Sequence, residues 1–213
     1  MDLAHRVGLN VAATELTTSL GHDVLLIERF DRTSTFGQRK MVVSVLTLFE
    51  LDEMTGRYAT YFELADMIRE RFTHPKATLR ELFSRIVFNI CVGNTDDHAR
   101  NHAAFWDGQM LTLTPAYDIC PQTRSGGEAA QAMTIGRNGF RLSQLKGCVE
   151  AAGTYLLDDV EARHIIDHQL DVIRTQWVDA ANTARLTDAQ RNTLWNRQIM
   201  NPFGAEGYTA RIL

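Results

Sequence analysis

The chain has 213 residues, 45% hydrophobic and 23% charged, so roughly 70% of its unfolded surface can be buried in one core and a single compact unit is expected. Its net charge of −4 and pI of about 6.0 exclude nucleic acid and membrane surfaces as main partners, because no positive field gathers phosphates or anionic lipids. Cys91, Cys120 and Cys148 are odd in number and widely spaced, which excludes a disulfide framework or zinc knuckle and predicts reduced, semi-buried core residues.

The amino-terminal part of the chain predicts one helix end and one strand. The residues MDLAHRVG are typical of the last turns of a helix that stops at Gly8. A strand is expected over residues 24–28, where four consecutive apolar residues indicate a strand covered on both faces. The polar residues 31–40 are typical of a linker. The opening residues lack the apolar stretch of a signal peptide, and no apolar run approaches the roughly 18 residues that span a bilayer, so cytoplasmic residence is expected.

The remaining sequence has mainly the periodicity of helices. One interruption is AAFWDGQMLTLTP, which predicts a β-hairpin of residues 103–106 and 110–114 around Asp107-Gly108. Residues 124–139 are expected to form a long surface loop beside the site. The predicted helices cover residues 61–72, 78–91, 142–152, 158–184 and 188–200.

Chemically capable side chains are densest in residues 94–102, NTDDHARNH, between an apolar helix and the predicted hairpin. Asp118 follows the hairpin and returns near its base, so Asp96, Asn101 and Asp118 are expected to converge. Phosphoryl transfer uses one Asp to accept the proton of the attacking hydroxyl, while an Asn and a second Asp hold magnesium against the phosphates. Asp96 and Asn101 are five residues apart, as in the protein-kinase catalytic loop, whereas Asp97 gives a spacing of four and fits less well.

Other interpretations of this cluster stay open at this point. A loop of Asp, Asn and Thr also caps helices and satisfies its own backbone. A metal-dependent hydrolase that uses the Asp-Asp-His cluster requires further ligands, for which His102 and Asp118 are the near candidates. A non-catalytic interaction module predicts an exposed apolar patch where a partner docks.

The quoted segments resemble a known family. The sequence FNICVGNTDDHARNH followed by LTPAYDI is similar to the catalytic loop and metal-binding segment of HipA-like serine/threonine kinases. LLIERFDR, residues 25–32, resembles the family's hinge strand, and AMTIG, residues 132–136, its segment after the metal-binding Asp. The resemblance implies a mainly α fold, with a protein-kinase-like helical large lobe, a short β-hairpin at the active site and a remnant hinge strand. It also implies a small-lobe and hinge remnant over residues 1–40 and a helical carboxyl-terminal lobe over residues 41–213.

The same resemblance implies roles for individual residues. Asp96 matches the general base, and Asn101 and Asp118 match the ligands of Mg²⁺. ATP is the implied substrate, and the residues that match its surroundings, besides Asn101 and Asp118, are Glu28, Arg29 and Phe30 of the hinge, with His98, Arg100 and Tyr117.

The family also implies partners. Its members phosphorylate serine on proteins, and the known cases are toxins that target aminoacyl-tRNA synthetases and are restrained by a helix-turn-helix antitoxin. This chain departs from the pattern ahead of the hinge, where neither a glycine-rich phosphate loop nor a strand lysine is found. We therefore expect an incomplete kinase: a truncated chain, the large-lobe subunit of a split enzyme with a small-lobe partner, or a remnant that only binds.

Overall fold

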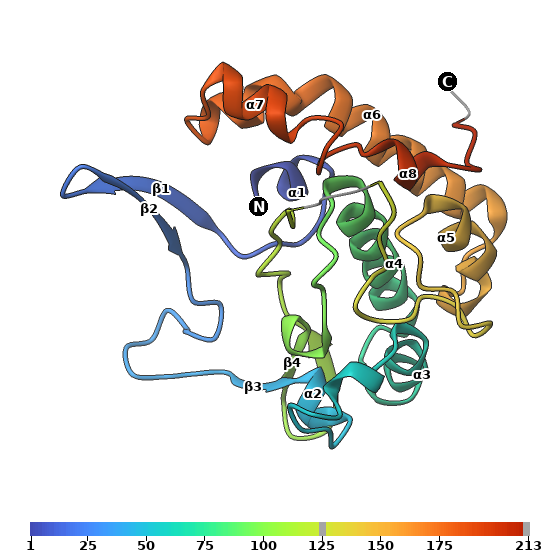
Figure 1. Cartoon of the computed structure of the whole chain (residues 1–213). Helices are drawn as coiled ribbons and strands as arrows, with labels where there is room; N and C mark the ends of the chain where they lie inside the picture. The colour runs from blue at the N-terminus through green and yellow to red at the C-terminus, as the bar shows by residue number, and fades with distance from the viewer. Residues whose placement is uncertain (124–126, 211–213) are drawn as a thin grey trace.

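The structure, a computed structural model, describes residues 1–123 and 127–210. Figure 1 shows a helical body from which a β-hairpin projects. The strands are β1 (Thr14–Ser19), β2 (His22–Ile27), β3 (Met41–Ser44), β4 (Ala103–Trp106) and β5 (Leu111–Leu113). The helices are α1 (Asp2–Arg6), α2 (Val45–Leu48), α3 (Tyr61–Arg71), α4 (Pro75–Val92), α5 (Leu145–Ala151), α6 (Asp159–Thr183), α7 (Asp188–Leu194) and α8 (Pro202–Ala205), with 3-10 turns η1 (Gly56–Tyr58), η2 (Ala99–Asn101) and η3 (Ala152–Tyr155).

Helix α4 is the centre of the core. Pro75 lies in its first turn, where the missing N–H has no intrahelical role and the fixed φ suits a helix. From Leu79 to Val92 the helix buries most of its side chains, on more than one face. It ends at Gly93, whose φ of +71° is left-handed and whose Cβ, if present, would lie 2.5 Å from the Gln198 carbonyl oxygen. Glycine is therefore required at this helix end.

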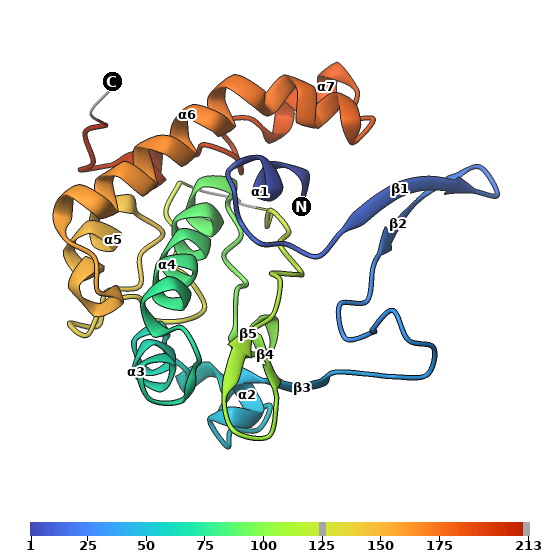
Figure 2. The same ribbon diagram turned by 180° about the vertical axis from the view of Figure 1, so that it is seen from behind.

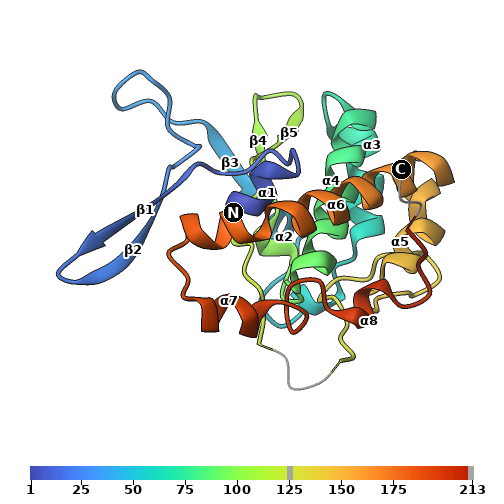
Figure 3. The ribbon, with the colours of Figure 1, turned by 90° about the horizontal axis from the view of Figure 1, so that it is seen from above.

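Helix α6 covers the body from one side. Its start is fixed by a capping box, because the Asp158 side chain accepts a hydrogen bond from the Glu161 N–H and the Glu161 carboxylate accepts one from the Asp158 N–H. Figure 3 shows α6 crossing the body, and it contacts α1, α4 and α5. The helix predicted over residues 158–184 is confirmed.

The other predicted helices are confirmed with shifted ends, with one exception. Helices α3, α4 and α5 agree with the predictions to within a few residues. The prediction of one helix over residues 188–200 is wrong, because α7 ends at Leu194 and Asn196 has a left-handed φ of +61°. The turn brings the Trp195 ring onto that of Trp177 with 5.9 Å between centroids. Burial of two large aromatic rings outweighs the local helical pattern.

The predicted hairpin, strands β4 and β5, is part of a three-stranded antiparallel sheet in the order β3-β4-β5. Ala104 of β4 pairs with Val43 on one side and Leu113 on the other. Its turn is centred one residue later than predicted, since the Asp107 N–H donates to the Met110 carbonyl and Gly108 has a φ of +103°. Strand β3 was not predicted, because its pairing partner lies some sixty residues further along the chain.

Strands β1 and β2 form the projecting hairpin. Its two-residue turn has positive φ at both Leu20 and Gly21, the geometry that matches the twist of paired strands. The prediction that residues 24–28 are covered on both faces is wrong, since Leu25, Leu26 and Ile27 are each about half exposed. Figure 2 shows the reason: the hairpin stands clear of the helical body, so neither face of the pair lies on the core.

The segment that follows the β4-β5 hairpin differs in part from the loop predicted over residues 124–139. Residues 124–126 lie outside the described residues. From residue 127 on, the segment has no regular helix or strand, as predicted, and residues 127, 128, 130 and 137–139 are exposed. Gln131, Met133 and Ile135 are buried, however, so the middle of the segment packs on the body, and we call residues 127–141 the strap. The Ala132 N–H donates to the Thr95 carbonyl. The strap is therefore joined directly to the loop that carries the candidate site.

The core is continuous through the helical body and includes Leu3 and Ala4 of α1 and Val7, which follows it, as the predicted helix end before Gly8 implies. Residues 31–40 form no strand or helix, in agreement with the predicted linker. Within residues 1–123 and 127–210, none of the helices combines the length and apolar character that crossing a bilayer requires.

Candidate active site

Residues 93–102 join α4 to β4 and form the candidate catalytic loop. Its first residues continue the hydrogen bonding of the helix end, because the Asn94 N–H donates to the Asn89 carbonyl and its side-chain amide donates to Asn89 Oδ1 at 3.0 Å. Asn94 is almost fully buried. The loop is therefore held at its start by helix α4 itself.

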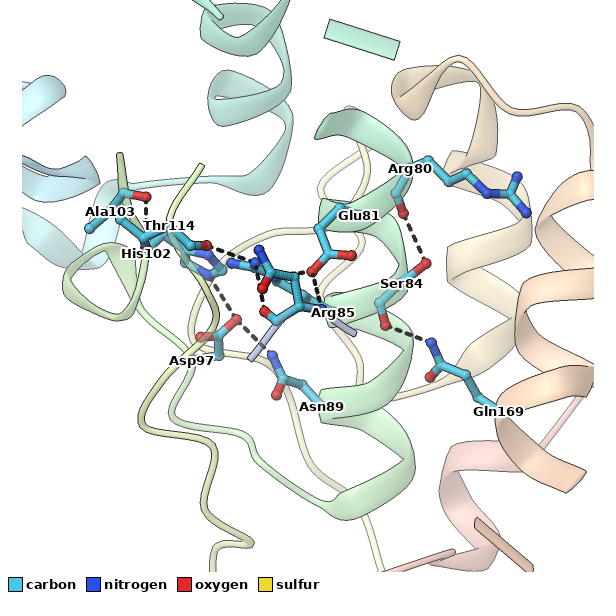
Figure 4. A network of polar contacts seen from close by, with 11 residues as sticks. Arg80, Glu81, Ser84, Arg85, Asn89, Asp97, His102, Ala103, Thr114 and Gln169 are labelled. Atoms are coloured by element: carbon cyan, nitrogen blue, oxygen red, sulfur yellow. Dashed lines mark hydrogen bonds and ion pairs between the residues drawn. The ribbon is translucent and has the colours of Figure 1, made fainter. Parts of the chain in front are cut away.

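Asp97 anchors the middle of the loop in the core (Figure 4). Its Oδ2 accepts hydrogen bonds from Tyr61 of α3 at 2.6 Å, from Asn89 of α4 at 2.8 Å and from His102 at 2.9 Å. All four side chains are buried. Side chains from α3, from α4 and from the end of the loop itself thus meet on one carboxylate oxygen, and the loop between α4 and β4 has one fixed position.

The electrostatics of this network favour a charged Asp97. Burial alone raises the pKa of the carboxyl, but the charge and hydrogen bond of His102 and the hydrogen bond of Tyr61 hold the pKa below its usual value. Burial and the Asp97 charge raise the pKa of Tyr61 well above its usual value, so its hydroxyl stays a donor. A carboxylate only accepts, so His102 must carry a proton on Nε2.

Asp96, the neighbouring residue, has the opposite environment. Its side chain is exposed, while Asn101 is 7% exposed and donates from Nδ2 to the Asp96 carbonyl oxygen at 3.3 Å. This bond points the amide nitrogen of Asn101 into the loop and leaves its Oδ1 as an oxygen ligand. Of two consecutive acids, one is fixed in the core and the other is presented to solvent beside Asn101.

A hydrogen bond joins the segment around Asp118 to the catalytic loop. The Tyr117 hydroxyl donates to the Arg100 carbonyl at 2.6 Å. Burial, with the charges of Asp97 and Asp118, raises the pKa of Tyr117 to about 12, so the hydroxyl stays protonated. Asp118 is exposed and has a left-handed φ of +57°, a conformation that Asp and Asn tolerate better than most residues.

Arg85 fixes the start of the segment that leads from β5 to Asp118. Its buried guanidinium bonds to Glu81 of α4 at 2.9 Å, to the Thr114 carbonyl at 2.9 Å and to the Asn10 carbonyl at 3.3 Å (Figure 4). Burial lowers the pKa of Arg85, an effect that Glu81 opposes, and an arginine remains charged regardless. The Ala116 N–H also donates to the Asn10 carbonyl. The strand end, the amino-terminal segment and α4 are therefore tied to one cation.

The hinge-like residues approach the site through one aromatic side chain. Phe30 lies 5.7 Å from the ring of Tyr117 and 5.9 Å from that of Phe105, centroid to centroid. Glu28 and Arg29 are exposed, and Arg29 makes two hydrogen bonds with Asp31, at 2.8 and 2.7 Å. Of the predicted hinge residues, Phe30 is thus the one in contact with the rest of the site.

Two side chains near this region were not found from sequence. Lys40 lies over the Phe105 ring, 4.7 Å from its centroid. Glu53 bonds to Arg100 at 2.6 Å across a sequence separation of 47 residues. His98, which also borders this contact, has a buried Nδ1 without a partner among the described residues. No local pattern carries a signal for pairs of such separation, so neither residue was predictable.

The donor set suits magnesium. Asn101 Oδ1 and the Asp118 carboxylate are hard oxygen ligands, and Mg²⁺ commonly takes one or two protein ligands together with substrate phosphates. Within the described part of the chain, no group of three or more His, Cys, Asp or Glu side chains is placed to hold a metal ion. Asp97 and His102 are engaged with each other, so the geometry gives no support to the hydrolase interpretation.

Comparison with curated proteins finds kinases. Residues 1–177 match the family model described as HipA-like C-terminal domain. The chain is 28% identical over 129 residues to the putative kinase Y4mE of Sinorhizobium fredii. It is 27% identical over 141 residues to the serine/threonine-protein kinase toxin HipA of Shewanella oneidensis. Each alignment covers 56% of this chain but only 30% and 32% of the two relatives.

Solved structures show the same fold. HipA of Shewanella oneidensis, from its complex with HipB and operator DNA, matches with a TM-score of 0.74 at 18% identity, over 93% of this chain and 51% of that one. The proinflammatory kinase CtkA of Helicobacter pylori matches with a TM-score of 0.54 at 15% identity, over 96% and 83% of the two chains. The predicted fold class, a kinase-like helical large lobe, is confirmed. The chain spans about half of the HipA chain.

Proposed function

The chain belongs to the family of HipA-like C-terminal domains, and we propose that it carries the phosphoryl-transfer site of a serine/threonine protein kinase that uses ATP and Mg²⁺. Two hydrogen bonds support the proposal most directly. Asn101 bonds to the Asp96 carbonyl and Tyr117 to the Arg100 carbonyl, so the loop with the candidate base and the segment with Asp118 are joined. Such a connection supports the proposal, because catalysis of phosphoryl transfer consists of positioning and electrostatics.

In this proposal each residue has one task. The Asp96 carboxylate, exposed to the acceptor, takes the proton of the substrate hydroxyl. Asn101 Oδ1 and Asp118 hold Mg²⁺, which when bound neutralises charge on the phosphates. The remaining nucleotide contacts that we propose come from Glu28, Arg29 and Phe30 at the hinge and from His98, Arg100 and Tyr117 beside the catalytic loop.

We further propose that residues 1–40 correspond to the hinge and part of the small lobe, and residues 41–213 to the large lobe. The groups that hold the α and β phosphates are then supplied by small-lobe residues of a longer protein or of a partner chain. The protein substrate that we propose is an aminoacyl-tRNA synthetase, the regulator is a helix-turn-helix antitoxin, and the setting is the cytoplasm. No direct contact with nucleic acid or membrane is part of the proposal.

Calorimetric titration with ATP tests the proposed site. Wild type is expected to bind ATP more tightly with Mg²⁺ than without it. Asp118→Asn is expected to remove this magnesium dependence, and Asn tolerates the left-handed φ, so the change tests the ligand rather than the backbone. Asp96→Asn is the matched control: it should leave binding intact but lower the rate of a complete enzyme by about 10²- to 10⁴-fold. Equal ATP affinity with and without Mg²⁺ would refute the site.

A second candidate, a non-catalytic module that docks a small-lobe partner, is favoured by the exposed apolar residues of the β1-β2 hairpin. Leu25, Leu26 and Ile27 lie in sequence on one strand, and Leu20 at the turn is 97% exposed. Two strands alone are rarely stable without further cover. This candidate predicts that Leu26→Glu abolishes capture of the partner without changing ATP binding. A partner that binds the variant equally well would contradict it.

A further inference from the structure

A pocket of about 290 Å³ lies beside the catalytic loop. One wall is formed by His98, Ala99 and Arg100, which begin two residues after Asp96. The second wall comes from α2, η1 and the segment between them, and the third from Ala132 and Arg141 of the strap. Of its lining residues, His98 and Arg100 are also nucleotide contacts in the function proposed above, whereas Arg57, Arg141, Asp52 and Glu53 have no role there.

The acidic side chains that line the pocket already have partners within the protein. Asp52 is occupied within its own turn, where its Oδ1 accepts from the Met54 and Thr55 N–H groups and from the Thr55 hydroxyl, and these bonds lower its pKa. Glu53 is occupied by Arg100. Asp52 therefore keeps its negative charge and Glu53 is paired with Arg100, while three arginines line the pocket against these two acids.

Two guanidinium groups have no such neutralising partner. Arg57 contacts the hydroxyl and ring of Tyr58. Arg141 donates from Nε and Nη2 to the carbonyl oxygens of Gln131 and Ala132, which orients it without neutralising it. Within residues 1–123 and 127–210, neither arginine has a carboxylate partner. The pocket therefore presents two arginines that still attract an anion, one of which is held in place by the strap.

We propose that this pocket binds an anionic side chain of the protein substrate, either a carboxylate or a phosphomonoester, and so selects acidic sequence near the acceptor hydroxyl. Arginine clusters recognise these two groups because the planar guanidinium offers paired donors to their oxygens. Attachment to the catalytic loop makes the site relevant to the acceptor, since an anchored side chain holds its neighbours beside Asp96. The inference rests on the proposed kinase function.

Glu53 has a role within the same inference. Its carboxylate lies on Arg100 in the absence of substrate, and an incoming anion competes for that guanidinium. Both partners are about half exposed or more, so the pair is weak and exchangeable. Removing the Glu53 charge should therefore strengthen binding of an acidic peptide, whereas removing Arg57 should weaken it. Damage to the fold would weaken peptide binding in both variants, so a gain in affinity in one and a loss in the other would indicate a direct effect of the two charges.

The experiment uses fluorescein-labelled nine-residue peptides with one central serine, flanked by glutamate, phosphoserine, glutamine or lysine. Binding to the full chain is measured by fluorescence anisotropy at low ionic strength, without nucleotide. Wild type is expected to bind the glutamate or phosphoserine peptide about tenfold more tightly than the glutamine peptide. The ratio between the two acidic peptides tells a carboxylate site from a phosphate site. Arg57→Gln should lose most of the preference and Glu53→Gln should increase it.

Arg174→Gln is the matched control, because Arg174 is exposed on α6 and the charge change is the same. It should keep the wild-type preference. Equal binding of the glutamate and glutamine peptides by wild type, an unchanged preference in Arg57→Gln, or tighter binding of the lysine peptide would overturn the inference. The ATP titration is run on the same samples. If ATP binding shows no magnesium dependence but the acidic peptides are still preferred, the kinase site alone is rejected. If ATP binding depends on magnesium but the acidic peptides are not preferred, this pocket alone is rejected.

Discussion

The adjacent acids Asp96 and Asp97 should behave oppositely when each is replaced by alanine. Asp97→Ala leaves three buried donors, on Tyr61, Asn89 and His102, without their shared acceptor. Breaking a buried charged network of this kind costs about 3–5 kcal/mol. For a protein of this size each kcal/mol lowers Tm by about 2–4 °C, so a fall of about 6–20 °C is expected. Differential scanning calorimetry and urea denaturation measure it.

The control is Asp96→Ala. Asp96 is exposed, and the bond it receives from Asn101 goes to its main-chain carbonyl, which the substitution keeps. The free energy of unfolding should therefore change by less than about 0.5 kcal/mol. Asp97→Asn should lie between the two, because it keeps the shape but removes the charge. If Asp97→Ala cost less than 1 kcal/mol, or if both alanine variants were equally destabilised, the assignment of an anchoring role to Asp97 would be refuted.

Three further outcomes are expected. Because the folded-state pKa of Asp97 is lowered, the contribution of the Asp97 carboxylate to stability is complete above about pH 4 and is lost as the pH falls through that folded pKa. The difference in unfolding free energy between wild type and Asp97→Asn should therefore shrink in acid. A difference that stays constant with pH would contradict this. Tyr117→Phe removes one hydrogen bond to the catalytic loop, about 1 kcal/mol, and should weaken ATP binding in the presence of Mg²⁺ about fivefold by calorimetry. An unchanged affinity would show that this bond does not position the segment. In the native protein a thiol reagent should label Cys120 quickly and the two buried thiols, whose pKa burial raises, only on unfolding; rapid reaction of all three would show that the core opens.

Local patterns were sufficient for the elements whose signals are local. The periodicity of α4 and α6, the helix end before Gly8 and the Asp107-Gly108 turn signal of the β4-β5 hairpin each depend on a few neighbouring residues. The spacing rule preferred Asp96 over Asp97 as the candidate base, and the structure buries Asp97 and exposes Asp96, which agrees with that preference. The catalytic role of Asp96 itself stays a prediction.

What the patterns missed depends on distant partners or on burial. The run of apolar residues at Val24 predicts a covered strand only if other elements lie against both faces, and in the described structure they do not. Strand β3 exists because β4 pairs with it, and the Glu53–Arg100 pair joins segments 47 residues apart. Similarly, Cys120 was expected as a semi-buried core residue but is exposed.

The close contact at Gly93 joins the carboxyl-terminal residues to the end of α4. Behind Gly93 the backbone of Gln198 fills the space that a side chain would need, and the Met200 N–H donates to the Cys91 carbonyl. These carboxyl-terminal residues lie beyond residue 177, where the match to the family model stops. A protein shortened to residues 1–177 would lose the backbone that packs against Gly93 at the start of the catalytic loop. It would also lose the Met200 N–H that pairs with the Cys91 carbonyl. The match to the family model and the packing around the catalytic loop therefore end at different residues.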